Sequence, residues 1–303
     1  MHPILVVGSV ALDSIETPFG EASRVVGGAA TYFSLAASHF THVRVVAVVG
    51  DDFDDECMRV FEGRRIDLDG LQRVPGETFR WKGKYSDDLN DRETIYTFLN
   101  VFETFRPTIP EAYRASPFVF LGNIHPALQL EVLDQVESPT LVAADTMNYW
   151  IEGTPDDLRR VLARIDALII NDAEARELSG ESNLVKAARA IRAMGPELVI
   201  IKRGEHGVLM TRRDGFFTAP GLPLEDVCDP TGAGDTFGGG FLGYLAGCPA
   251  VTDEALARAV IAGSTMASFS VEAFGLARLL RVTDEEIKRR FLEFKRLTHF
   301  EKL

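Results

Sequence analysis

Short apolar runs alternate along the chain with longer amphipathic stretches. The runs are rich in Val, Ile and Leu, and they read ILVVG, VRVVAVVG, FVFLGN, LVAADT, ALIIND and LVIIKRG. Strands without a polar face are typical of a mainly parallel sheet that helices cover on both sides. The amphipathic stretches predict helices at 28–39, 52–62, 183–194, 253–270 and 283–297. The pattern therefore predicts an α/β protein built in three layers, α/β/α.

Two stretches predict antiparallel hairpins instead. Asp214-Gly215 separates two apolar runs in GVLMTRRDGFFTAP, which is a hairpin signal. Residues 76–103 alternate aromatic and polar positions on either side of a polar turn at 87–91. Together with the extended segment 14–26, this hairpin is predicted to form a small sheet that projects from the main domain. The pattern fits an antiparallel edge of the main sheet equally well.

Composition is that of an ordinary globular protein. With 303 residues, 46% of them hydrophobic, the chain can bury a core without disulfides or metal, and we predict one domain over 1–303. Cys57, Cys228 and Cys248 form neither a disulfide framework nor a metal motif, which favours a reducing, cytoplasmic setting. A formal charge of −13 argues against a nucleic-acid binder or a protein held on anionic lipid. The first apolar run is too short to span a membrane.

The stretch DPTGAGDTFGGGF, residues 229–241, carries the strongest chemical signal. Pro230 marks a turn, after which a helix is predicted to begin. Gly232 and Gly234 let the backbone approach a ligand closely, and the free N–H groups of a first helical turn suit an anion. Beside such a site, the carboxylate of Asp235 can orient an attacking hydroxyl and accept its proton during phosphoryl transfer. The structural alternative is that Asp235 only improves the start of the helix.

This stretch resembles the C-terminal signature of the ribokinase-type (PfkB) carbohydrate kinases. VVGGAATYFSLAAS at 25–38 resembles their N-terminal glycine-pair signature, and VGSVALDSI, INDAEARELSG and IKRGEHGVLM follow the family's order and spacing. The resemblance covers nearly the whole chain and implies a ribokinase-like fold whose lid is formed by 14–26 and 76–103. It also implies an ATP-dependent, Mg²⁺-using kinase that phosphorylates a small polyol. A sugar is the first choice of acceptor, and a nucleoside or inositol is the alternative.

The resemblance assigns roles to individual positions. Asp235 is the implied catalytic base, and Gly232, Ala233 and Gly234 form the implied anion hole. The predicted acceptor-binding residues are Asp13, Gly27, Gly28, Tyr32, Asn123 and Asn148. Asn123 and Asn148 belong to this set because they follow apolar strands. The predicted ATP-binding residues are Asn171, Glu174, Lys202, Gly204 and Gly207, and Glu174 is expected to hold Mg²⁺ through water.

Two positions depart from the family pattern. Tyr32 stands where many members have Asn, which argues against ribose itself and offers a ring that could stack on a nucleobase or on a sugar's apolar face. Lys202 stands where Thr is commoner. Several predicted site residues could instead have a purely structural role. Asp13 could start a loop, the glycines could form turns, and Asn171 with Glu174 could cap a helix. His125 and Asp145 also follow strand ends, and His125 is expected to be structural.

Two rival classes of protein remain open. A nicotinamide-dependent oxidoreductase would need its glycine fingerprint near residue 8, whereas GGGFLG at 238–243 falls inside a predicted helix. A ligand-binding sensor without turnover shares the fold, although the residues for chemistry are all present. An exposed edge of the small sheet makes a homodimer the expected assembly. Some relatives bind a monovalent cation near the position of Asp229.

Overall fold

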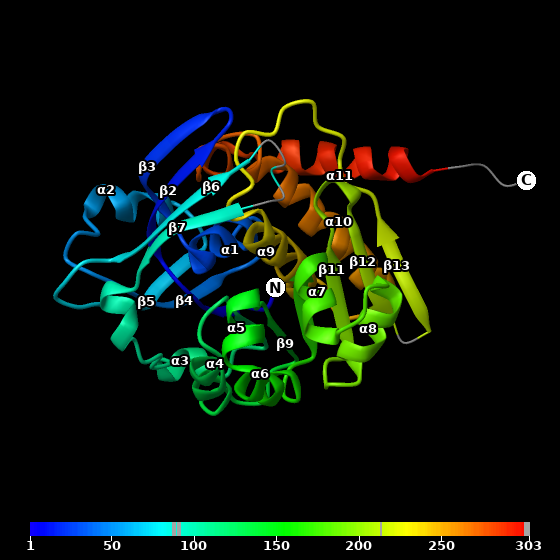
Figure 1. Cartoon of the computed structure of the whole chain (residues 1–303), viewed down its shortest axis with the longest axis horizontal. Coiled ribbons are helices and arrows are strands. Elements are labelled where there is room, and N and C mark those ends of the chain that lie inside the picture. Colours follow the sequence, from blue (N-terminus) through cyan, green and yellow to red (C-terminus); the bar gives the residue numbers. More distant parts are fainter. Residues whose placement is uncertain (87–88, 90–91, 213, 300–303) are drawn as a thin grey trace, which may run out of the picture.

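The main structural element is a nine-stranded sheet. The computed structural model describes residues 1–303 except 87–88, 90–91, 213 and 300–303. The strand order is β13-β12-β11-β10-β9-β8-β1-β4-β5, and all pairs are parallel except those made by β12 (Figure 1). The strands are β1 (Ile4–Val7), β4 (Val43–Val49), β5 (Ile66–Arg73), β8 (Phe118–Leu121), β9 (Leu141–Ala144), β10 (Ala167–Asn171), β11 (Leu198–Lys202), β12 (Val208–Arg212) and β13 (Gly215–Ala219).

The six apolar runs of the sequence are six parallel strands of this sheet, so the predicted fold class is confirmed. In β1, Ile4 and Val6 belong to one hydrophobic cluster, while Leu5 and Val7 belong to another on the opposite face. Every position of such a strand is buried, which explains the missing polar alternation. The edge strand β5 was not predicted, because its sequence IDLDGLQR alternates polar and apolar residues and is only half-buried.

Helices cover both faces of the sheet and complete the three layers. One face packs against α1 (Ala29–Ala37), α9 (Ala233–Ala246) and α10 (Asp253–Ser270). The other face packs against α4 (Pro126–Leu133), α6 (Pro155–Leu162), α7 (Asp172–Ser179) and α8 (Leu184–Arg192). Shorter or peripheral helices are α2 (Asp55–Met58), α3 (Glu111–Arg114), α5 (Asn148–Gly153) and α11 (Asp284–Thr298). The helix predicted at 52–62 is shorter than expected, because only α2 and a following 3-10 turn form there.

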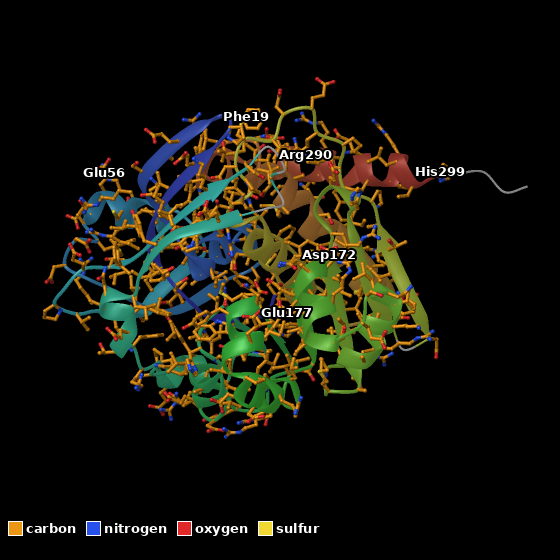
Figure 2. The ribbon with its side chains drawn as sticks, viewed as in Figure 1. Phe19, Glu56, Asp172, Glu177, Arg290 and His299 are labelled. Atoms are coloured by element: carbon orange, nitrogen blue, oxygen red, sulfur yellow. The ribbon has the colours of Figure 1, made fainter. Side chains whose placement is uncertain are left out.

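A separate four-stranded sheet lies against one end of the main sheet, with the order β3-β2-β6-β7 (Figure 1). Its strands are β2 (Ala11–Thr17), β3 (Gly20–Gly27), β6 (Phe79–Tyr85) and β7 (Arg92–Phe98). Parallel pairing of β2 with β6 joins the two hairpins, so the second hairpin is not an edge of the main sheet. Phe19 is exposed at the turn of the first hairpin (Figure 2). The predicted turn at 87–91 lies, apart from Leu89, outside the described residues.

Helix α9 is packed unusually closely between α1 and α10. A Cβ on Gly239 would lie 2.3 Å from the carbonyl oxygen of Phe33 in α1. A Cβ on Gly240 would lie 2.8 Å from the carbonyl oxygen of Ala262 in α10. The run GGGFLG thus serves helix packing, as its position inside a predicted helix indicated, and it fixes where α9 begins.

We expect Gly239→Ala to destabilise the fold by about 1–3 kcal/mol, because the added methyl group forces α1 and α9 apart. Urea denaturation measures this free energy of unfolding. Gly153→Ala is the matched control, since a Cβ there meets no atom within 4 Å. Equal stability of the two variants would contradict the close contact between α1 and α9.

Candidate active site

Four neighbouring parallel strands bring polar residues to one edge of the main sheet. The registers of β10 with β11 and of β8 with β9 align Asn171 with Lys202, and Leu121 with Ala144. Asp145 directly follows β9, so it lies at the same carboxyl edge. Open α/β sheets bind ligands at this edge.

The turn before α9 is held in place by Asp229. Its Oδ1 accepts a hydrogen bond from the N–H of Thr231 at 2.9 Å, and its Oδ2 accepts one from the N–H of Gly275 at 2.8 Å. Gly232 caps the helix with φ of +72°, a left-handed conformation that favours glycine. Asp235 is the third residue of the helix and belongs to its first turn, in which the N–H of Ala233 donates to the carbonyl oxygen of Pro230 at 3.2 Å.

Tyr32 supports this turn from within α1. A Cβ on Gly232 would lie 2.4 Å from Cγ of the tyrosine ring, so only glycine allows the turn to rest on the ring. The side chain is 1% exposed, and its hydroxyl has no hydrogen-bond partner among the described residues. The ring is therefore covered by protein and is not presented for stacking on a nucleobase, a role that the sequence left open.

Asp13 and the glycine pair fit together tightly. Asp13 belongs to β2 and is 4% exposed. A Cβ on Gly27 would lie 2.0 Å from Oδ2 of Asp13, and Gly28 has φ of +92° with Ser9 in close contact. Burial raises the pKa of Asp13 to about 7, against a hydrogen bond from the N–H of Gly28 and with help from the charge of Asp235. Gly27 thus ends β3 without a side chain and leaves room for the Asp13 carboxylate, and Gly28 makes the turn into α1.

Asn171 and Glu174 form the capping box of α7. Oδ1 of Asn171 accepts from the N–H of Glu174, and Oε2 of Glu174 accepts from the N–H of Asn171, both at 2.8 Å. The structural alternative for this pair is therefore present. Burial, helped by the charge of Asp145 and opposed by that of Lys202, raises the pKa of Glu174 to about 7. Glu174 is thus a cap that also faces the other charged residues of the site.

Acidic groups gather around one ammonium group at this edge. Burial raises the pKa of Asp235 to about 7, the charge of Asp145 adds to the rise, and Lys202 and then Arg92 oppose it. Nζ of Lys202 lies 3.9 Å from Oδ2 of Asp145. A carboxylate with a pKa near neutrality is suited to accept a proton from a hydroxyl.

The remaining predicted residues occupy the surroundings of this cluster. Oδ1 of Asn123 accepts a hydrogen bond from Nε1 of Trp150 at 2.8 Å, and Nδ1 of His125 accepts one from the N–H of Ala127, so His125 is a helix cap as expected. Asn148 begins α5 and is exposed. Gly204 and Gly207, which follow Lys202, both have positive φ and shape the turn into β12.

The small sheet contributes two side chains that the sequence did not identify as site residues. The hydroxyl of Thr231 donates to the hydroxyl of Tyr85 at 3.1 Å, which links β6 to the turn before α9. Arg92, opposite Tyr85 in the β6–β7 register, lies over the Trp81 ring, and its charge opposes the raised pKa of Asp235. Only the aromatic alternation of 79–85 hinted at Tyr85. No local pattern distinguishes Arg92 from other exposed arginines.

The oxygen ligands present suit Mg²⁺ held through phosphate and water. Within the described residues no three His, Cys, Asp or Glu side chains form a metal cage. The carboxylate of Asp145 lies close enough to Glu174 and to Asp235 for its charge to raise the pKa of each, and a divalent cation would relieve that repulsion. Mg²⁺ commonly binds through one or two carboxylates, with substrate phosphates and waters completing its shell.

Residues 1–281 match the pfkB family carbohydrate kinases. The chain belongs to this family. It is therefore an ATP-dependent small-molecule kinase. A cytidine kinase from Thermococcus kodakarensis is 32% identical over 257 residues, which cover 82% of this chain and 91% of that protein.

Solved structures share the fold of this PfkB kinase. The nucleoside kinase of Methanocaldococcus jannaschii has a TM-score of 0.78 at 20% identity, covering 97% of this chain and 99% of that chain. A ribokinase II from E. coli, solved with ATP and Mg²⁺, has a TM-score of 0.77 at 18% identity, covering 97% and 100%. Kinases of this family use ATP with Mg²⁺.

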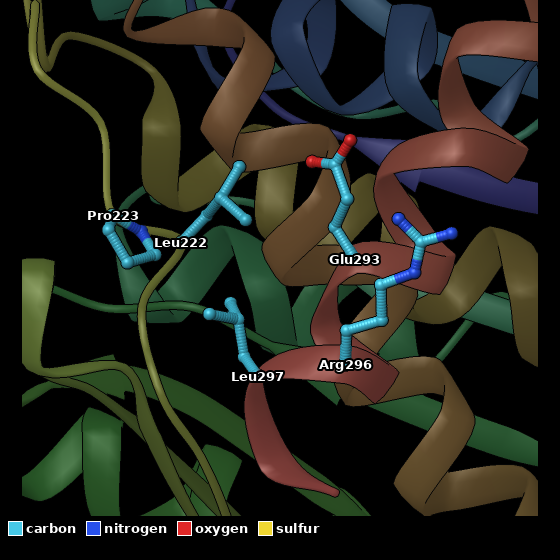
Figure 3. Close-up of a pocket in the computed structure, with 5 residues that line it drawn as sticks. All are labelled: Leu222, Pro223, Glu293, Arg296 and Leu297. Carbon is cyan, nitrogen blue, oxygen red and sulfur yellow. The ribbon is translucent and has the colours of Figure 1, made fainter.

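A surface hollow of about 400 Å³ lies between α11 and the segment after β13 (Figure 3). None of the residues that line it belongs to the predicted site of this PfkB kinase; they are Leu222, Pro223, Glu293, Arg296 and Leu297. Among the described helices, none has the length and apolar character needed to cross a bilayer.

We expect Asp235→Asn to stabilise this PfkB kinase at pH 8. The pKa of Asp235 is about 7 in the folded protein against an ordinary 3.8, so the folded state holds its proton more tightly. Its favourable contribution is complete below about pH 4 and is lost as the pH rises through about 7. Neutral Asn avoids this loss, and the free energy of unfolding should rise by about 1–3 kcal/mol at pH 8.

Thermal unfolding at pH 5 and pH 8 tests this prediction. Wild type and Asp235→Asn should melt at similar temperatures at pH 5, where Asp235 is protonated, and several degrees apart at pH 8. Asp156→Asn, at an exposed position of α6, should give no such difference. A gain that is equal at both pH values would show that charge is not its cause.

Proposed function

We propose that this kinase transfers the γ-phosphoryl group of ATP to a hydroxyl group of a nucleoside. The observation that carries the proposal is the position of Asp235 in the first turn of α9, behind the Gly232 turn and close enough to Asp13 for their charges to interact. An anion site, a base of raised pKa and a second buried acid are what transfer to a hydroxyl requires.

The transfer step follows from these groups. Asp13 accepts a hydrogen bond from the acceptor within the turn made by Gly27 and Gly28. Asp235 orients the attacking hydroxyl and accepts its proton as the new O–P bond forms. The bond between the γ-phosphorus and the bridging oxygen breaks, and its electron pair leaves with ADP. The N–H groups of Gly232, Ala233 and Gly234 are proposed to stabilise the charge on the transferred group, and that of Ala233 must first leave the carbonyl oxygen of Pro230, to which it donates at 3.2 Å.

ATP is proposed to lie along the carboxyl edge of β10 and β11. Asn171, Lys202, Gly204 and Gly207 are the proposed contacts there, and Glu174 would hold Mg²⁺ through water. When bound there, Mg²⁺ would neutralise part of the charge of the phosphate groups. A monovalent cation near Asp229 stays a prediction from the sequence. In the structure, both carboxylate oxygens of Asp229 accept backbone hydrogen bonds.

Two observations favour a nucleoside over a free sugar as acceptor. The relative that is 32% identical over most of both chains is a cytidine kinase. Trp81 lies beside Asp13 in the register of β2 with β6, so the two side chains share one face of the small sheet. The half-buried indole, over which Arg92 also lies at 5.3 Å from the ring centroid, is proposed to contact a flat base beside Asp13. Tyr32, buried beneath the turn, would act on the acceptor site through its packing.

The first test measures ADP release from Mg-ATP with nucleosides, pentoses, hexoses and inositols as acceptors. We expect turnover with a nucleoside and a fall in kcat of about 100-fold or more in Asp235→Asn, because a positioned base is lost. ATP affinity should change little. Wild-type turnover in Asp235→Asn would refute the catalytic role, and turnover with sugars alone would move the acceptor class to carbohydrates.

The small sheet is proposed to act as a lid that keeps water from the transferred phosphoryl group. Its support is the hydrogen bond between Thr231 and Tyr85, which brings the end of β6 onto the anion turn. Exposed Phe98, stacked on half-buried Tyr96 along the edge strand β7, supports the proposed homodimer. A cytoplasmic location remains a prediction from the sequence.

Trp81→Ala should raise the KM of the acceptor about tenfold and increase hydrolysis of ATP without acceptor, because the lid loses its aromatic cover. Phe19→Ala is the matched control, since this aromatic side chain is 63% exposed at the turn between β2 and β3 of the same sheet. Steady-state kinetics with and without acceptor measure both effects. The same kinetics for the two variants would leave Trp81 without a role in covering the acceptor.

A further inference from the structure

Lys202 places a cation where a protein rarely puts one. It is the last residue of β11, and a Cβ on Gly234 would lie 2.6 Å from its Nζ. The ammonium group therefore touches the backbone of the first turn of α9. This end of a helix carries a partial positive charge, so side chains found there are usually neutral or acidic. A lysine beside it needs negative charge close by.

The acidic residues of the site keep this ammonium group protonated but leave its hydrogen-bond donors available to a ligand. Burial alone would lower the pKa of Lys202, but the charges of Asp145, Glu174 and Asp235 raise it above its ordinary value. Within the described part of the chain, the one carboxylate in ion-pair range is Asp145, at 3.9 Å, which is longer than a hydrogen bond. The lysine side chain is 18% exposed, so its donors can reach a ligand.

We infer that Lys202 binds the γ-phosphoryl group of ATP, the group that is transferred, and not only the nucleotide in general. This inference rests on the proposed function and extends it. The ammonium group lies against Gly234 in the first turn of α9, and Asp235 is the next residue of that turn. During transfer, charge spreads over the three equatorial oxygens of the phosphoryl group, and backbone N–H groups on one helix turn approach them from one side. Lys202 approaches from the end of β11.

ADP and ATP should therefore differ in their need for Lys202. ADP lacks the γ-phosphoryl group, so it leaves the ammonium group without its proposed partner. A lysine that served only to pair with Asp145, or that contacted only the rest of the nucleotide, would affect both nucleotides alike. The ratio of the two affinities separates these roles without any acceptor.

The experiment is calorimetry of Mg-ADP and of the non-hydrolysed β,γ-imido analogue of ATP, with Mg²⁺, on wild type and Lys202→Met. We expect the analogue to bind at least tenfold more weakly to the variant, and ADP less than threefold more weakly. Lys202→Thr, which also removes the charge, is the second variant if the first does not fold, as judged by thermal unfolding. Either variant should lose the discrimination between the two nucleotides.

An equal loss of affinity for both nucleotides, or no loss for either, would overturn the assignment of Lys202. A wild type that binds neither nucleotide would overturn the proposed function together with it. A wild type that binds both nucleotides but turns over no nucleoside would refute only the proposed acceptor. In that case the affinity ratio of the variant still decides the role of Lys202.

Discussion

The site depends on the close packing of α9 between α1 and α10. Consecutive glycines let the helix axes approach until backbone meets backbone, and this contact sets the direction of α9. Its N-terminus is thereby aimed at the carboxyl ends of the central strands. Tyr32 supports the same N-terminus through Gly232. The anion turn therefore owes its position to this helix packing together with the Asp229 carboxylate, which accepts hydrogen bonds from the N–H groups of Thr231 and Gly275.

That placement carries an electrostatic penalty. Asp13, Glu174 and Asp235 each have a pKa raised to about 7, with burial as the main cause, and Lys202 offsets only part of the repulsion. Such groups weaken the folded state near neutral pH, and sites for chemistry commonly hold this kind of strain. The hydrophobic clusters on the two faces of the sheet supply the stability that this arrangement consumes.

The sequence predicted the fold more completely than the site. Apolar runs located six parallel strands because burial on both faces leaves a strong signal, whereas the half-buried β5 left a weak one. The turn at 229–235 was readable because glycine, proline and an acid follow one another directly. The meeting of Lys202 with Gly234, and of Tyr85 with Thr231, was not readable, because it depends on how separate elements pack. A helix cap and a ligand site both require Asn at position 171 and Glu at position 174, so the sequence could not distinguish the two roles.

The parallel pairing of β2 with β6 also constrains the order in which the protein folds. Ala11 pairs with Phe79, and the chain between them contains α1, β4 and β5 of the main domain. Each hairpin can form locally, but β2 can pair with β6 only after the intervening strands have folded. The reason is that closing a long, unordered loop costs conformational entropy. The pairing of β2 with β6 thus depends on the folding of the elements between them. A molecule without this pairing would be compact and would keep Asp235 in place, yet its Asp13 would no longer be held against β6.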